Sequence, residues 1–125
     1  MASREARLNY PGGVFHAISR GVGGQFLIRG EEERERYLTL LGRVLKRTDA
    51  EILAWCLMSS HVHLIVIQGA EPLGRLFKPL HTGFARFINS RRRGRGGKGS
   101  VFADRPRTLL VDADAYLLEL AIYSQ

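Results

Sequence analysis

The sequence predicts an α+β domain with the element order β-α-β-β-α-β and an additional helix at the C-terminal end. Short runs rich in β-branched and aromatic residues alternate with stretches whose apolar residues recur every three or four positions; these are the patterns of strands and helices. This order is typical of the ferredoxin-like sandwich, an antiparallel sheet with both helices on one face. At 125 residues, the chain is expected to form one domain over residues 1–125.

The first half of the chain is expected to form a strand, a helix and a hairpin. A β-rich run that ends in a glycine-rich turn predicts a strand at Val14–Arg20. Apolar residues at helical spacing, with glutamates in the first turn and basic residues in the last, predict a helix over Glu31–Arg47. Two further strands, Glu51–Met58 and His61–Gln68, are joined by two serines that form a tight turn.

The second half opens with a long apolar stripe at helical spacing that contains a proline. Pro79 removes a backbone donor and clashes with the preceding turn, so this helix is expected to kink or to begin later than the stripe. A basic, glycine-rich loop is expected at Asn89–Ser100, a fourth strand at Arg107–Val111 and a last helix from Ala115 onward. The stripe consists of Leu73, Leu76, Phe77, Leu80, Phe84, Phe87 and Ile88.

The residues before the hairpin turn are apolar and are expected in the core. They include Trp55, Met58 and Cys56, the single cysteine of the chain. One cysteine excludes a disulfide framework and a thiolate zinc cluster. Apolar runs are far shorter than the ~20 residues that span a bilayer, and the N-terminus lacks the apolar segment of a signal peptide. We therefore expect a cytoplasmic protein that does not bind membranes.

The charge of the chain predicts a polyanionic partner. Lys and Arg number 19 against 12 acidic residues, which gives a net charge of +7. Between Pro72 and Ala103 there are eight basic residues and no Asp or Glu. Such a stretch of one sign indicates a nucleic acid partner, and the alternative is a solvated loop that only aids solubility. The eight residues are Arg75, Lys78, Arg86, Arg91, Arg92, Arg93, Arg95 and Lys98.

Two histidines interrupt the second strand of the hairpin. Side chains two apart on a strand point to the same face, so His61 and His63 stand side by side. Neighbouring imidazoles can share one divalent ion, with a third ligand from elsewhere in the fold. The alternative is two polar residues on a half-exposed face with ordinary hydrogen bonds. His16 and His81 are interpreted as structural or surface residues.

Two tyrosines, Tyr116 and Tyr123, lie two helical turns apart on the expected last helix. Both can face the sheet, and the usual role of such a tyrosine is apolar packing with its hydroxyl at the rim. Periodicity does not distinguish between the two residues.

Four segments of the chain resemble, in the same order, segments of the single-tyrosine HUH transposases. The closest subgroup is that of the REP-associated tyrosine transposases, and the resemblance extends over nearly the whole chain from Tyr10 onward. The segments are FHAISRG, WCLMSSHVHLIV, FARFINSRR and VFADRPRTLLVDADAYLLELAIY.

The resemblance implies an enzyme that cleaves and rejoins one strand of single-stranded or hairpin DNA. It implies that His61 and His63 hold a divalent metal, Mg²⁺ or Mn²⁺, and that Tyr123 is the nucleophile that forms a 5′-phosphotyrosine. Phe102 is a candidate for stacking on a splayed base. The expected contacts to the DNA backbone are Arg20, Arg86, Arg91, Arg92, Arg93, Arg95 and Lys98.

The sequence departs from the family pattern at its end. It stops at Gln125, two residues after Tyr123, before the polar residue that often completes the metal site in this family. Two explanations stay open: the sequence is part of a longer chain, or the protein is a naturally shortened relative. The second gives the alternative function, a degenerate relative that only binds hairpin or single-stranded DNA. An RNA-binding module is disfavoured, because no aromatic RNA-binding motif lies on the expected strands.

The resemblance also bears on assembly and location. It implies a cytoplasmic, nucleoid-associated protein. Family members include monomers and homodimers that exchange the tyrosine helix, and the sequence does not choose between these two states.

Overall fold

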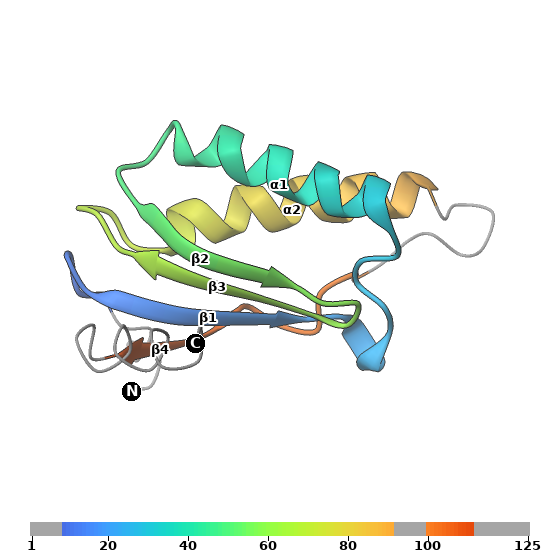
Figure 1. Ribbon diagram of the computed structural model, residues 1–125, viewed down its shortest axis with the longest axis horizontal. Coiled ribbons are helices and arrows are strands. Elements are labelled where there is room, and N and C mark those ends of the chain that lie inside the picture. Colours follow the sequence, from blue (N-terminus) through green and yellow to red (C-terminus); the bar gives the residue numbers. More distant parts are fainter. Residues whose placement is uncertain (1–8, 92–99, 112–125) are drawn as a thin grey trace, which may run out of the picture.

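The computed structural model describes residues 9–91 and 100–111, and these residues form a four-stranded sheet covered by two helices (Figure 1). The predicted order β-α-β-β-α-β is confirmed, whereas the expected C-terminal helix lies outside the described residues. A short 3-10 helix follows the first strand. The elements are β1 (Val14–Arg20), α1 (Glu31–Leu45), β2 (Glu51–Leu57), β3 (His61–Ile67), α2 (Gly74–Arg91) and β4 (Arg107–Val111).

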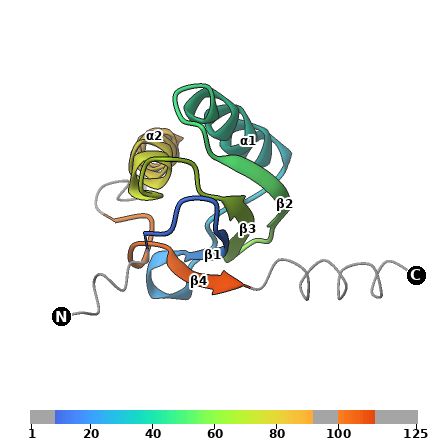
Figure 2. The same cartoon turned by 90° about the vertical axis from the view of Figure 1, so that its left-hand side faces the viewer.

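The strands lie in the order β2-β3-β1-β4, and every neighbouring pair is antiparallel. This is the ferredoxin-like arrangement that the sequence predicts, with β1 and β3 at the centre. Both helices lie on the same side of the sheet, as the end-on view in Figure 2 shows. The sheet therefore has one face covered by helices and a second face that neither helix covers.

The hydrophobic core fills the space between the sheet and the helices. Along β3, Val62, Leu64 and Val66 are buried in this core. Because side chains alternate between the two faces of a strand, the residues between them point to the uncovered face. The core positions of β3 thus fix the orientation of His61 and His63.

The helix α2 runs without interruption from Gly74 to Arg91 and includes Pro79 in its second turn. It begins one residue after Leu73, the first residue of the apolar stripe, and not after the proline. The missing backbone bond lies near the start of the helix, where few turns depend on it. The predicted stripe is confirmed as the packing face of this helix, where Leu76, Phe77, Leu80, Phe84 and Ile88 are buried.

The expected burial of the residues before the hairpin turn is wrong for three side chains. Trp55 is 55% exposed and Met58 is 49% exposed, and Cys56 is also exposed. Cys56 lies opposite His63, on the face of the sheet that neither helix covers, and Met58 follows the last residue of β2. Trp55 lies on an edge strand, which has a neighbouring strand on one side only. Within β2 only Leu57 is buried.

The described residues contain no helix with the length and apolar composition that crossing a membrane requires.

Candidate functional site

His61 and His63 lie side by side on the uncovered face of the sheet. Their ring centroids are 5.9 Å apart. In the register of the sheet, His61 lies opposite Arg20 of β1, and His63 lies between Ile18 of β1 and Cys56 of β2. The juxtaposition predicted from the sequence is confirmed, whereas metal binding by the pair stays a prediction.

His16 joins this pair from the neighbouring strand. Its Nε2 lies 3.0 Å from Nδ1 of His63, and the two ring centroids are 5.2 Å apart. The interpretation of His16 as a structural or surface residue therefore missed a direct contact with the candidate site. The alternation of β1 assigns His16 to the same face as Ile18, but only the strand pairing shows that His63 lies across from Ile18.

Hydrogen bonds fix the orientation of both imidazoles of the pair. Nδ1 of His61 lies 3.1 Å from the hydroxyl of Ser60, and Nδ1 of His63 contacts His16. The Nε2 atoms of His61 and His63 have no hydrogen-bond partner within the part of the chain that the structure describes. Metal-binding histidines commonly have this arrangement, with one ring nitrogen hydrogen-bonded and the other on the ion.

The electrostatics of the site favour neutral imidazoles. Burial lowers the pKa of His16 and of His63 below the ordinary histidine value, and for His63 the neighbouring His16 and His61 lower the pKa further. Neutral imidazoles keep the lone pair that a metal ion requires. Among residues 9–91 and 100–111 no three His, Cys, Asp or Glu side chains converge as a metal site, so the pair alone is an incomplete ligand set.

Two exposed arginines lie on the same face as the histidines. Arg20 is the register partner of His61, so their side chains are neighbours on this face. Arg107 of β4 lies opposite Ile18, which in turn lies opposite His63. Arg20 was predicted from the sequence as a DNA contact. Arg107 was not, because the position of β4 beside β1 is a property of the tertiary fold.

The remaining predicted DNA contacts fall into three groups. Arg86 is exposed on α2, on the helical side of the sheet. Arg91, at the end of the same helix, contacts Glu32 at 3.1 Å and Glu33 at 3.2 Å. Its charge is thus largely compensated within the protein, and its role as a DNA contact stays a prediction.

The third group lies outside the described residues. It comprises the basic residues Arg92, Arg93, Arg95 and Lys98. The two candidate nucleophiles, Tyr116 and Tyr123, also lie outside the described residues. The roles assigned to these six residues therefore stay predictions.

Comparisons with known proteins find similarity in structure and not in sequence. No known protein family and no curated protein matches the chain. The structure is similar to that of a REP-associated tyrosine transposase bound to a REP hairpin, with a TM-score of 0.69 and 13% identity over 90% of this chain. A Deinococcus radiodurans protein named as a candidate transposase matches with a TM-score of 0.57 and 18% identity, over 90% of this chain and 89% of its own.

This chain has the fold of a REP-associated tyrosine transposase. The fold implied by the four sequence segments is thereby confirmed. The chain spans 64% of the length of the REP-associated tyrosine transposase.

Proposed function

We propose that this protein binds single-stranded or hairpin DNA on the uncovered face of its sheet and cleaves and rejoins one strand through a 5′-phosphotyrosine intermediate. The observation that carries the proposal is the pair His61 and His63, whose Nδ1 atoms are both hydrogen-bonded and whose Nε2 atoms have no partner among the described residues. This pair stands on a transposase-like fold, beside two exposed arginines.

The described residues supply two of the ligands that a divalent ion requires, and imidazole nitrogens are suitable ligands for such an ion. His61 and His63 would hold it through Nε2, and His16 and Ser60 would keep the two rings in orientation. Mg²⁺ or Mn²⁺ held by these residues would polarise the phosphoryl oxygens of the scissile phosphate and stabilise the charge on the departing oxygen. Because neutral imidazoles carry no charge of their own, they leave the positive charge of the ion available to the phosphate.

The covalent step requires a tyrosine, and the family resemblance assigns Tyr123. Its phenolic oxygen releases its proton to solvent and bonds to phosphorus while the bond from phosphorus to the 3′ oxygen breaks. The departing oxygen takes up a proton from solvent and becomes a 3′-hydroxyl. The 5′ phosphate stays on the tyrosine, so the reverse reaction rejoins the strand without ATP.

Neither tyrosine among the described residues is placed for this role. Tyr37 is fully buried in the core, and burial raises the pKa of its phenol. Tyr10 is hydrogen-bonded through its backbone to Gln68, beyond the far end of β3. Gln68 is five strand residues from His63, about 16 Å at the usual rise of a strand. This distribution supports a nucleophile from residues 112–125.

The proposal is tested with a labelled hairpin oligonucleotide and Mn²⁺, followed by a denaturing gel that separates a covalent protein–DNA adduct. We expect an adduct with the wild type, none with Tyr123→Phe, and an adduct with Tyr116→Phe as the matched control. If the wild type shifts the DNA on a native gel but forms no adduct, the protein only binds DNA. If Tyr123→Phe forms as much adduct as the wild type, the nucleophile is another residue, and Tyr116 is the next candidate.

A further inference from the structure

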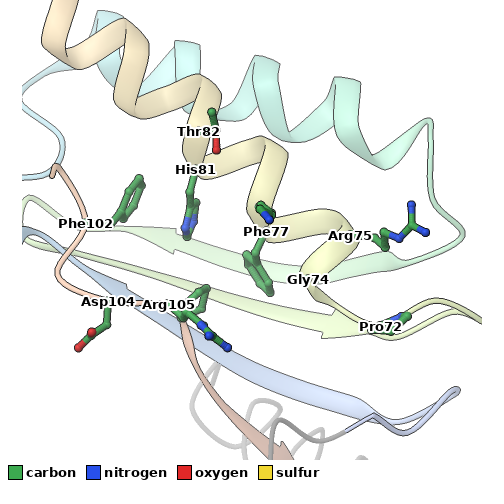
Figure 3. A pocket seen from close by; sticks show the side chains of 11 residues that line it. Pro72, Gly74, Arg75, Phe77, His81, Thr82, Phe102, Asp104 and Arg105 are labelled. Carbon is green, nitrogen blue, oxygen red and sulfur yellow. The ribbon is translucent and has the colours of Figure 1, made fainter. Parts of the chain in front are cut away.

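A cavity of about 840 Å³ opens between α2 and the segment that leads into β4. Side chains from the first turns of the helix face the segment 102–106 across this space (Figure 3). Its size lies within the ~300–1,000 Å³ of typical small-molecule sites. The cavity is on the helical side of the sheet, and the histidine pair is on the other side.

The inner wall of the cavity is aromatic. Phe102 is stacked on His81, with a centroid distance of 3.9 Å and an angle of 12° between the rings, and the ring of Phe77 lies 5.6 Å from His81. Nε2 of His81 lies 3.5 Å from the hydroxyls of Ser19 and Tyr37, which anchor the ring to the core. Flat, rigid rings of this kind are the surfaces on which bases stack in proteins that bind single strands.

His81 adds an aromatic surface to this wall, and no charge. Burial lowers the pKa of His81 to about 4. The ring is therefore neutral at pH 7, and any attraction for a phosphate has to come from other side chains.

The rim of the cavity is positively charged. It carries Arg75, Lys78 and Arg105, against one carboxylate, Asp104. All three basic side chains are exposed, and none of them forms an ion pair with a described residue. They are available to a phosphate group, in contrast to Arg91, which contacts two glutamates.

The rim also connects the cavity to the face that carries the histidines. Arg105 lies at the cavity and Arg107, two residues later, belongs to the edge strand β4 on the uncovered face. A second hollow, lined by Arg105, Pro106 and Thr108, follows the same edge. A DNA strand that passes around β4 would meet basic side chains on both sides of the sheet.

We propose that the cavity between α2 and residues 102–106 binds one unpaired nucleotide of the DNA strand, with its base against Phe102 and its phosphate at Arg75, Lys78 and Arg105. This inference rests on the proposed function, because it assigns a subsite to the same DNA. A cavity that combines an aromatic wall and a cationic rim matches the two parts of a nucleotide, whereas paired bases within a duplex do not present their faces.

The experiment measures the affinity of the protein for hairpin oligonucleotides with single-stranded flanks, in which one abasic nucleotide is moved along each flank. Fluorescence anisotropy gives the Kd for the wild type, for the double variant Lys78→Glu with Arg105→Glu, and for Arg43→Glu. Arg43 is an exposed residue of α1 that lines neither hollow, so Arg43→Glu serves as a charge-reversal control outside the cavity. Circular dichroism spectra verify that all three proteins are folded.

At one flank position we expect the abasic substitution to weaken binding to the wild type about tenfold, since removal of one stacked base has an effect of this order. The double variant should not show this position-specific penalty, and Arg43→Glu should retain it. DNA binding without a penalty at any position, or with the same penalty in all three proteins, would overturn the cavity assignment and leave the proposed function intact. Failure of the wild type to bind any of the oligonucleotides would overturn both.

Discussion

Nε2 of His16 lies 3.0 Å from Nδ1 of His63, although 47 residues separate them in the sequence. The contact joins the two central strands of the sheet, β1 and β3. It holds the ring of His63 through Nδ1, which leaves Nε2 for the ion. Such supporting contacts influence a metal site because they fix both the tautomer and the direction of the ligand.

We predict that His16→Ala lowers the affinity for Mn²⁺ about 10- to 100-fold, the usual effect of removing a hydrogen-bond partner of a ligand. Isothermal titration calorimetry of the protein with Mn²⁺ alone measures this affinity without DNA. Cys56→Ala is the matched control, because Cys56 flanks His63 on the same face from the other neighbouring strand. Equal affinities of His16→Ala and wild type would show that His16 does not position the ligand.

Arg20 and Arg107 are expected to bind phosphates on the uncovered face. Replacing both by Ala should weaken DNA binding and reduce the slope of log K against log salt by about one unit for each phosphate that is no longer neutralised. Arg91→Ala should change the slope much less, because Arg91 already contacts Glu32 and Glu33. Anisotropy titrations at several salt concentrations test both statements, and a larger slope change for Arg91→Ala than for the double variant would reverse the assignment.

Features encoded within one segment of the sequence were predicted correctly, whereas contacts between distant segments were not. The bounds of β1 and β4 agree with the predicted Val14–Arg20 and Arg107–Val111, because alternation and turn residues are encoded within the segment itself. The pair His61 and His63 was found for the same reason. The contact with His16 was missed because it depends on the register between β1 and β3, which no local pattern specifies.

Burial along β2 was predicted incorrectly for a related reason. Trp55 and Cys56 were expected in the core because they are apolar residues of a strand, but this strand lies at the edge of the sheet and both side chains are exposed. Composition identifies these side chains as apolar, but their exposure depends on what packs against each of them, which is a property of the tertiary fold. The cavity beside α2 could not be predicted from the sequence either, because Phe77 and Phe102 line the same cavity only in the folded protein.

Arg91 is predicted to contribute to stability through its contact with Glu33. Glu33 is 3% exposed; its carboxylate accepts a bond from the backbone N–H of Arg29 at 2.8 Å, and Arg91 donates to it at 3.2 Å. Arg91→Ala should lower the free energy of unfolding by about 1–3 kcal/mol, because it removes a donor from a buried charged acceptor. Urea unfolding measures this change. Arg86→Ala, on the exposed side of the same helix, should alter stability by less than about 0.5 kcal/mol, and similar decreases for both variants would contradict this role.

His81 predicts how stability depends on pH. Burial lowers its pKa from 6.5 to about 4 in the folded protein, so between these values the unfolded chain binds the proton that the folded protein excludes. The contribution of neutral His81 to the free energy of unfolding is therefore fully present above pH 6.5. It is lost as the pH falls towards 4, and a pKa shift of this size corresponds to about 3 kcal/mol. His81→Phe keeps an aromatic ring without a titrating group, and urea unfolding at a series of pH values should show a much smaller decrease over this interval.

The lowered pKa values of His16 and His63 act in the same direction and leave a residual slope in the variant. An unchanged slope in His81→Phe would mean that His81 accepts its proton without disturbing the packing, in conflict with its position between Phe102 and the hydroxyl of Tyr37.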